Sequence, residues 1–323
     1  MMLGALTSLA SPSGGRARLT TFYFHRVLPQ PDPLLPGEPD ARRFDAILGW
    51  IGNQFRVLDP LDACERLYAG TLPARAAIVS FDDGYRNNFE IALPILQRHG
   101  MKAVVFVATA FLDGGCMFND RVIEAVRRAA APVLPGDAIA SATDLPLRGD
   151  AERRAAISQT LDAIKGLPPD DRNQRVARIE RALGAPAAER LMMDAREVAA
   201  MSRAGMHIGG HTRTHPILCA LDDASATDEI AGGLDDLTDI TGTRPRLFAY
   251  PNGRYGRDYD RRHVAMVDAA GCAYAFTTQP GAATLASNRL ELPRFTPWAR
   301  TRMRFGLMAL RNLADAGARV ARH

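Results

Sequence analysis

Two adjacent carboxylates stand where a short apolar run ends. The run Ala76–Phe81 is rich in aliphatic residues, and Asp82, Asp83 and Gly84 follow it directly. This pattern predicts a buried strand that ends in a tight turn. Neighbouring residues within a strand point to opposite faces, whereas two acids in the loop after a strand can reach one pocket. One acid could then bind a metal ion while the other acts as a base; the ordinary alternative is an Asp-Gly turn without chemistry.

A pair of histidines follows another short apolar segment. His211 and His215 lie four residues apart after residues 206–210, which end in two glycines. Imidazole nitrogens and a carboxylate oxygen are a common ligand set for zinc, and three protein ligands leave positions open for water and substrate. Such a pair is a weak signal alone, but it becomes much stronger beside Asp82 and Asp83.

Three ordered segments resemble the motifs of one enzyme family. Residues 80–85 read Ser-Phe-Asp-Asp-Gly-Tyr, residues 211–216 read His-Thr-Arg-Thr-His-Pro, and residues 248–253 read Phe-Ala-Tyr-Pro-Asn-Gly. They look like the first, second and third motifs of the polysaccharide deacetylases, carbohydrate esterase family 4. The similarity covers roughly residues 19–112 and 198–295, which is most of the chain apart from a central insert.

The resemblance implies a role for each matching residue. Asp83, His211 and His215 would ligate a divalent metal; zinc is the default from the ligand types, although cobalt, nickel or iron would accept the same set. Asp82 would be the general base. The backbone N–H of Asn252, where the family usually has tyrosine, would stabilise the oxyanion.

The chain departs from the family pattern in two places. The family often has an arginine shortly before the proline of its third motif, whereas residues 248–250 here read Phe-Ala-Tyr. Arg294, at the end of the last predicted strand, could orient the base instead; it could equally be a surface arginine. The family's late Leu-x-His motif is also missing, because no histidine lies between His263 and His323. His25, after the first predicted strand, resembles the acid of relatives that carry it there. We predict that it protonates the leaving nitrogen rather than serving a structural role alone.

The other histidines are interpreted as structural. His99 stands at a predicted helix end, where a cation suits the helix dipole. His207 precedes the histidine motif on its strand and is expected to face away from the pocket, and His263 is expected in the middle of a helix.

Strands and helices alternate on both sides of the central region, which predicts a parallel sheet or barrel of the α/β class. Strands are expected at residues 19–24, 55–58, 76–81, 103–108, 206–209, 246–250, 273–277 and 290–295. Helices are expected at residues 44–52, 62–69, 87–99, 223–241 and 258–270. This suits the distorted (β/α)7-type, TIM-like barrel that the resemblance implies. In such barrels the working groups lie at the carboxyl ends of the strands, where the candidate site residues fall.

The region of residues 119–203 has helical patterns and no convincing strand. Helices are expected at 150–164, 171–183 and 194–204. We interpret the region as an α-helical insertion in a single barrel domain that spans residues 1–323. The insertion could cap the site and select the substrate, or it could be padding on the flank of the barrel.

The two ends of the chain give different signals. Residues 1–17 are expected to be loose. From Arg300 onward, Met303, Leu307, Leu310 and Leu313 recur at helical spacing among arginines, which predicts an amphipathic helix at about 300–318. That helix could lie peripherally on an anionic membrane surface, or it could simply pack on the barrel wall.

Composition limits the function classes. The chain has 323 residues, of which 47% are hydrophobic, enough for one large core or two modest domains. A net charge of +4 gives no reason to expect nucleic acid as a partner. The four cysteines are scattered and are expected to be free thiols. The start resembles no secretory signal, and no apolar run approaches the roughly 20 residues of a membrane span, so a cytoplasmic location is expected.

We therefore predict a hydrolase of linear amides, acting on carbon–nitrogen bonds other than peptide bonds. It would remove the acetyl group of an N-acetylhexosamine in a glycan or glycan precursor, as in bacterial exopolysaccharide biosynthesis, with an N-acetylated saccharide as its partner. Removal of an O-acetyl or formyl group, or a catalytically inactive glycan-binding barrel, remain as alternatives. A glycosidase is unsuited, because the adjacent Asp82 and Asp83 cannot flank a glycosidic bond.

Overall fold

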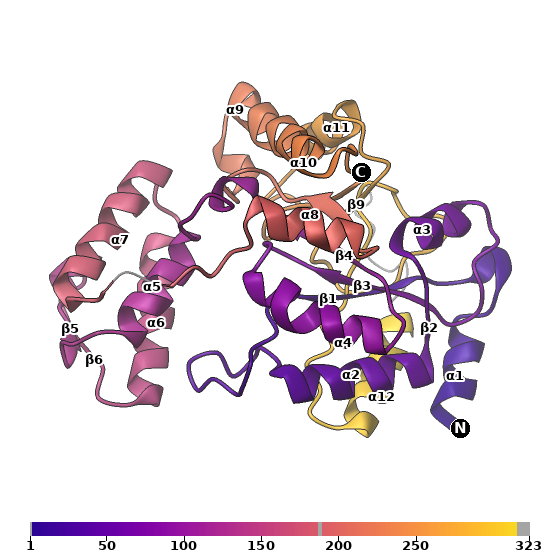
Figure 1. The fold of residues 1–323 in the computed structure, drawn as a ribbon, viewed down its shortest axis with the longest axis horizontal. Coiled ribbons are helices and arrows are strands. Elements are labelled where there is room, and N and C mark those ends of the chain that lie inside the picture. Colours follow the sequence, from indigo (N-terminus) through magenta and orange to yellow (C-terminus); the bar gives the residue numbers. More distant parts are fainter. Residues whose placement is uncertain (1, 187–188, 315–323) are drawn as a thin grey trace. The chain divides into compact units, whose positions relative to one another are not determined.

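The structure is a computed structural model that describes residues 2–186 and 189–314, and it divides into two compact units (Figure 1). The first comprises Met1–Gln30, Gly37–Asp113 and Met192–His323, and the second comprises Pro31–Pro36 and Gly114–Leu191. The second unit differs from the expected insertion at about 119–203. It includes a proline-rich loop near the N-terminus, and it excludes helix α8 (Ala195–Arg203), which packs on strand β7 (His207–Gly210) of the first unit.

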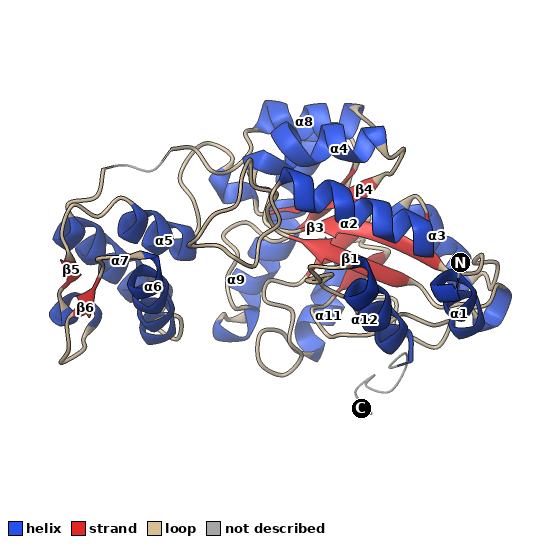
Figure 2. Cartoon of the chain, turned by 90° about the horizontal axis from the view of Figure 1, so that it is seen from below, coloured by secondary structure: helices blue, strands red, loops and turns tan. Residues whose placement is uncertain are grey.

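The first unit is built on a parallel sheet. Its strands are β1 (Thr20–Phe24), β2 (Arg56–Val57), β3 (Ala76–Phe81), β4 (Ala103–Val107), β7, β8 (Leu247–Ala249) and β9 (Tyr274–Phe276). Their order is β1-β3-β4-β7-β8-β9, and β2 pairs with β3. Figure 2 shows these strands together, with the helices of the first unit around them. Every pairing in this sheet is parallel, as the alternation of strands and helices predicts.

The expected last strand, residues 290–295, closes the sheet without forming a continuous ladder. Leu292 bridges Phe276 of β9, and Phe295 bridges Phe22 of β1, both in parallel. The Phe295 N–H donates to the carbonyl of Thr21 at 2.8 Å. Pro293 lies between the two bridges and has no N–H to donate, so the ladder is interrupted there. The curled sheet is therefore a distorted barrel of the predicted (β/α)7 type.

Alternation along the strands separates the barrel interior from its helix-covered wall. Ala76 and Ile78 of β3 pack in one core cluster with Phe106 and other inward-facing residues. The intervening residues of β3, such as Val79, pack in another cluster with helix residues. Because successive strand residues face opposite sides, Asp82 continues the inward-facing set at the carboxyl end.

Helices surround this sheet. They are α1 (Met2–Ala10), α2 (Ala41–Gln54), α3 (Pro60–Tyr68), α4 (Leu93–Arg98), α8, α9 (Asp223–Thr227), α10 (Gly233–Thr241), α11 (Arg261–Ala269) and α12 (Arg302–Ala314). Aspartates cap several of them; the Asp40 carboxylate, for example, accepts the N–H of Arg43 at the start of α2. The helices expected at 87–99 and 223–241 each include a π-helical turn, at Asn88–Ala92 and Asp228–Gly232.

The prediction that residues 1–17 are loose is wrong. Residues Met2–Ala10 form α1, which packs on α2 and α12, and Gly14–Arg16 form a short 3₁₀ turn. The Gln54 side chain, buried at the end of α2, donates to the Thr7 hydroxyl at 2.9 Å. Tertiary contacts thus stabilise a helix too short to be stable alone, which explains why its sequence gave little signal.

The C-terminal helix packs on the barrel by a different face from the predicted one. Phe305, Ala309 and Leu313 of α12 are buried, whereas Met303 and Leu307 are exposed. The expected apolar stripe therefore mixes two faces of the helix. The expected end at about 318 lies outside the described residues.

The second unit contains three helices, α5 (Phe118–Arg127), α6 (Asp150–Ile164) and α7 (Pro169–Leu183), with a 3₁₀ turn at Gly136–Ile139. The expectation of a strand-free region is wrong in detail, because β5 (Val133–Leu134) and β6 (Leu145–Pro146) form a small antiparallel pair. The unit has its own apolar core, to which Leu34 of the proline-rich loop contributes. An ion pair of 2.6 Å between Arg127 and Asp32 also holds that loop to the unit.

No helix among the described residues is long and apolar enough to cross a membrane.

Candidate metal and acyl-transfer site

The three predicted ligands lie together at the carboxyl end of the sheet. The Nε2 atom of His211 is 3.4 Å from Oδ1 of Asp83, and the Nε2 atom of His215 is 3.5 Å from the same oxygen. One ligand atom from each residue lies within 4.8 Å of the others. Asp83 follows β3 and His211 follows β7, so two strands separated in the sheet only by β4 bring the three groups to one point.

The hydrogen bonds of this cluster suit a divalent cation. His211 donates its Nδ1–H to the carbonyl of Ala249 at 2.6 Å, so in the neutral ring Nε2 is a bare acceptor directed at Asp83. The buried Oδ1 of Asp83 meets no hydrogen-bond donor among the described residues. Burial lowers the pKa of His215 to about 4, so the ring of His215 is neutral near pH 7. Acceptors that converge on one buried point repel one another unless a cation lies between them.

The backbone around these ligands is held in an uncommon conformation. Asp83, His215 and Asn252 have φ values of 76°, 55° and 58°, in the left-handed region that residues other than glycine seldom adopt. Thr212, between the two histidines, has a φ of 65°. Such conformations persist only where the surroundings enforce them, and they concentrate at functional sites.

The loop that carries the histidines is anchored by acidic residues that the sequence analysis did not single out. The Glu229 carboxylate accepts the backbone N–H groups of Arg213 and Thr214 at 2.9 and 2.8 Å. The Arg213 guanidinium forms an ion pair with Asp236 at 3.1 Å. Within the loop, the Thr212 hydroxyl accepts the N–H of His215 at 3.1 Å. The only advance signal was the run of acids in residues 222–239.

Strand β7 leaves no room for side chains where it passes through the barrel interior. A Cβ atom on Gly209 would lie 2.4 Å from Cδ1 of Phe106, well inside a van der Waals contact. The glycine therefore lets β7 approach the large rings of the interior and places the next inward-facing residue, His211, at the strand end.

Asp82 is bound by the arginine proposed for it. Arg294 donates two hydrogen bonds to the Asp82 carboxylate, at 2.6 and 2.8 Å, and both side chains are buried. Arg294 also donates its Nε–H to the carbonyl of Thr277 at 2.8 Å, and its guanidinium lies 4.5 Å from the ring centroid of Tyr23. Burial alone would raise the pKa of Asp82, but the positive charge of Arg294 holds it below the ordinary value. Asp82 is therefore an oriented, ionised carboxylate beside the histidine cluster.

His25 follows β1 and lies in the electrostatic field of the same acids. Its ring centroid is 5.8 Å from that of Tyr23. Burial alone would lower the pKa of His25, but the charges of Asp83, Asp82 and Glu38 raise it above the ordinary value. Glu38, which accepts the backbone N–H of Arg26 at 3.3 Å, was not singled out from the sequence.

Asn252 follows β8 in a strained turn. Its carbonyl accepts the hydroxyl of Thr278 at 2.6 Å. Within the described part of the chain its own N–H meets no acceptor, so this donor is available for another group.

A second cluster of ligand types lies elsewhere in the first unit, formed by Cys219, Asp260 and His263. Both ring nitrogens of His263 are already used: Nδ1 accepts the N–H of Asp260 at 3.0 Å, and Nε2 donates to the carbonyl of Leu218 at 3.1 Å. His263 is thus the third residue of α11 and part of its N-terminal cap, not a mid-helix residue as expected. Its role is nevertheless structural, as predicted.

The two remaining structural histidines each contact an aspartate. Nε2 of His99 lies 2.9 Å from Asp45, and Nε2 of His207 lies 2.9 Å from Asp59, which caps α3. Neither belongs to the histidine cluster around Asp83.

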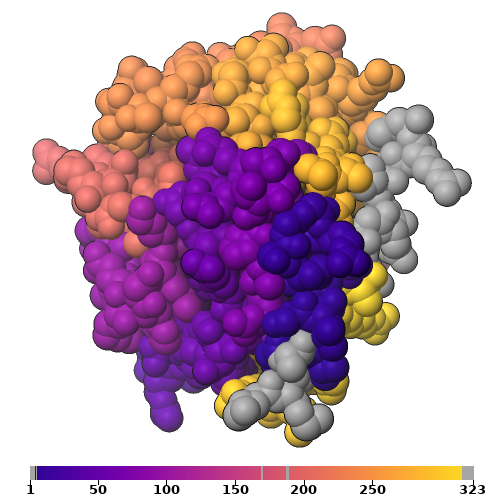
Figure 3. Space-filling model, turned by 90° about the vertical axis from the view of Figure 1, so that its right-hand side faces the viewer, coloured from indigo at the N-terminus to yellow at the C-terminus, as the bar shows by residue number. Residues whose placement is uncertain are grey.

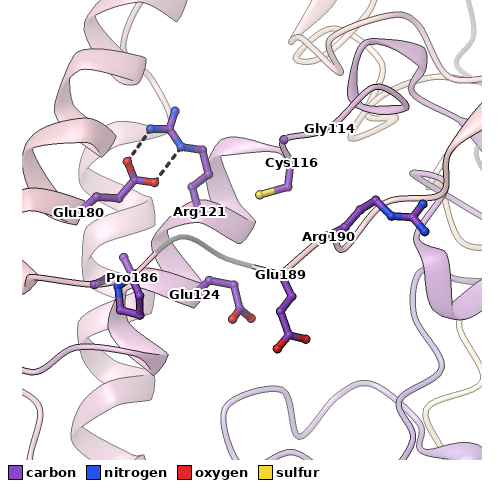
Figure 4. Close-up of a pocket in the computed structure, with 11 residues that line it drawn as sticks. Gly114, Cys116, Arg121, Glu124, Glu180, Pro186, Glu189 and Arg190 are labelled. Carbon is purple, nitrogen blue, oxygen red and sulfur yellow. Dashed lines mark hydrogen bonds and ion pairs between the residues drawn. The ribbon is translucent and has the colours of Figure 1, made fainter.

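The second unit contains a pocket of about 490 Å³ (Figure 4). Part of its charged lining is paired within the unit: Arg121 forms two hydrogen bonds with Glu180 at 2.9 and 2.6 Å, and Glu124 forms ion pairs with neighbouring arginines. Burial raises the pKa of the Cys116 thiol to about 12, so it is not a nucleophile near pH 7.

Both a family model and a curated relative match parts of this chain. The family model described as polysaccharide deacetylase matches residues 69–131 and 171–274, slightly more than half of the chain. A stretch of 93 residues is 34% identical to YxkH of Bacillus subtilis (strain 168), a protein named as a polysaccharide deacetylase. That stretch covers 28% of this chain and 32% of YxkH, so the chain matches about a third of that relative's length.

Solved deacetylase structures share the fold. The deacetylase PplD of Streptococcus pyogenes, in complex with acetate, gives a TM-score of 0.60 at 16% identity, over 92% of this chain and 98% of that one. IcaB from Ammonifex degensii gives a TM-score of 0.56 at 16% identity, over 93% of this chain and 98% of IcaB. A de-N-acetylase from Aggregatibacter actinomycetemcomitans gives a TM-score of 0.54 at 16% identity, over 86% of this chain and 94% of the de-N-acetylase. At such identities the likeness concerns the fold alone.

Proposed function

Because the chain belongs to the polysaccharide deacetylase family, we propose that it is a metal-dependent hydrolase that removes the acetyl group of an N-acetylhexosamine in a glycan or glycan precursor. The observation that carries this proposal is that two adjacent acids have different partners. Asp83 faces two histidines through an oxygen without a donor, whereas Asp82 is held by Arg294.

Asp83, His211 and His215 would hold the metal, with zinc as the first choice from their types. A divalent cation bound there would polarise the acyl carbonyl and lower the pKa of a water molecule. The three residues contribute a net charge of −1, which leaves the filled site cationic toward an approaching carbonyl oxygen.

Asp82 serves as the general base. Its two oxygens are fixed by Arg294, so the carboxylate keeps one orientation and accepts a proton from the attacking water through a remaining lone pair. Arg294 keeps Asp82 ionised at the pH of the reaction, and its bond to the carbonyl of Thr277 fixes the guanidinium in turn. Arg294 is thus a positioning residue.

Two further groups complete the proposed reaction. The free N–H of Asn252 stabilises the negative charge that develops on the carbonyl oxygen. His25, whose pKa the neighbouring acids raise, carries the proton that the departing nitrogen requires. It takes the place of the late histidine that the chain lacks.

Acetate release from N-acetylglucosamine oligomers tests the proposal. Metal-stripped protein is assayed with and without added zinc, beside a His25→Ala variant. Zinc-dependent release that the variant loses supports the deacetylase and the assigned acid. Release by the variant at the wild-type rate contradicts the role of His25. No release from any oligomer by zinc-loaded wild type contradicts the proposed substrate, and a panel of O-acetylated and formylated sugars then separates another acyl hydrolase from a binding-only barrel.

A further inference from the structure

Helices α1 and α12 of the first unit pack against each other, and each exposes large apolar side chains. Leu6 and Leu9 of α1 are 46% and 80% exposed, and Met303 and Leu307 of α12 are 72% and 59% exposed. Among the described residues, only Leu285 and Trp298 are large apolar side chains of comparable exposure. We call the surface formed by these four residues and the arginines of α12 the α1–α12 face. Figure 3 shows the indigo N-terminal segment at the molecular surface.

This exposure does not arise from loosely attached helices. The opposite side of α12 is buried through Phe305, Ala309 and Leu313. The buried side chain of Gln54 contacts both helices, since it donates to the Thr7 hydroxyl at 2.9 Å and reaches the carbonyl of Gly306 at 3.5 Å. Each helix is thus fixed by one side and presents apolar groups to solvent on the other; apolar groups gathered on one surface are typical of an interaction site.

The charge of the face is of one sign. Helix α12 carries Arg302, Arg304 and Arg311, all exposed, and the sequences of α1 and α12 contain no aspartate or glutamate. None of these three arginines forms an ion pair within the described residues. By contrast, helices α9 and α10 and the turn between them, residues 223–241, carry many acids and no arginine or lysine. The cationic charge of the face is therefore a local feature and not the average of the surface.

Apolar side chains flanked by unpaired arginines match the interface of an anionic bilayer. The apolar groups can enter the boundary between headgroups and acyl chains, while the guanidinium groups bind lipid phosphates. We propose that the α1–α12 face binds peripherally to a membrane surface rich in anionic lipids. The proposal is independent of the acyl-transfer chemistry, because none of its residues belongs to the site around Asp83.

Vesicle flotation tests this proposal with the full-length protein. Wild type is expected to float with vesicles that contain phosphatidylglycerol, to float far less with pure phosphatidylcholine, and to be released by high salt. Arg302→Gln/Arg304→Gln/Arg311→Gln should weaken partitioning about tenfold or more, given the contribution of each basic residue near such a surface. Met303→Ser/Leu307→Ser should weaken it at low salt too, through lost apolar burial.

The matched control is Arg196→Gln/Arg203→Gln, which removes two exposed arginines from α8 and should float like wild type. Acetate release from soluble oligomers should be unchanged in all these variants, which separates failure of this proposal from failure of the proposed enzyme. Equal flotation of wild type and both α12 variants would overturn the proposal. A second result would also overturn it: wild type forms a dimer without lipid, measured by light scattering, and the Met303→Ser/Leu307→Ser variant is a monomer. The face would then bind a second copy of the chain.

Discussion

Two clusters in the first unit contain side chains of the types that bind metals, yet they can do different things. Around Asp83, each histidine directs Nε2 at a carboxylate oxygen that has no donor. Around His263, both ring nitrogens are already bonded to the backbone, one to the N–H of Asp260 and one to the carbonyl of Leu218. Proximity of ligand types is thus insufficient; what separates a metal site from a helix cap is which lone pairs remain unused.

The largest expected effect comes from the first cluster. His211→Ala removes one of three ligands and leaves Asp83 and His215 unable to hold the ion in place. Acetate release should fall to the background of the assay. His263→Gln, in the second cluster, should keep most of its specific activity when it is folded. A comparable loss of acetate release in both variants would contradict the different roles that we assign to the two clusters.

Asp82→Asn should abolish the proposed base while leaving the proposed metal ligands in place. The variant keeps Asp83, His211 and His215, so it should bind metal like wild type, while turnover falls by about 10²- to 10⁴-fold through loss of the proton acceptor. Turnover and metal content are measured on the same sample. Wild-type turnover in this variant would show that Asp82 is not the base.

Arg294→Lys tests the positioning of that base. Lysine keeps the positive charge but cannot donate the paired hydrogen bonds that hold both oxygens of Asp82. The expected result is a fall in kcat of about tenfold to a hundredfold, as for the loss of one charge-assisted hydrogen bond, with KM nearly unchanged. A rise in KM at constant kcat would assign Arg294 to substrate binding instead.

His263→Gln should affect stability rather than chemistry. It disturbs two hydrogen bonds of the buried His263 ring and should lower the free energy of unfolding by about 1–3 kcal/mol near neutral pH. Burial lowers the pKa of His263, so below about pH 6.5 the unfolded chain binds a proton that the folded chain resists. The stability contributed by His263 is therefore present above that pH and is lost as the pH falls. Urea unfolding at several pH values should show the gap between wild type and variant narrowing in acid; a gap that widens would contradict the assignment.

The smallest effect is expected for Cys219→Ser. The Cys219 thiol lies 3.9 Å from Asp260 and contributes little to the cap. Activity, metal content and unfolding free energy should all match wild type within error. Loss of bound metal in this variant would show that the second cluster is occupied after all.

Local sequence patterns were sufficient to place the two loops that carry the proposed ligands. The apolar run before Asp82 and Asp83 and the segment before His211 each predict a strand end from their own residues, and both are strands in the structure. The alternation of strands and helices likewise predicted the parallel sheet. These features depend on neighbours in sequence, which is why they could be predicted.

The remaining features depend on tertiary contacts. Arg294 reaches Asp82 across 212 residues, and no local pattern distinguishes it from a surface arginine. Helix α1 forms because Thr7 and its neighbours pack against α2 and α12, not because its sequence is strongly helical. The position of His263 at a helix start depends on where α11 begins, and boundaries are the weakest part of a sequence prediction.

The metal content of three proteins decides whether Asp83 belongs to a metal site. Wild type, Asp83→Ala and His263→Gln are stripped of metal, dialysed against zinc at equal concentration, and analysed by elemental mass spectrometry. We expect one tightly bound ion in wild type and in His263→Gln, and none in Asp83→Ala. An ion that persists in Asp83→Ala but is lost from His263→Gln would place the metal at the cluster around His263 and would overturn the proposed site.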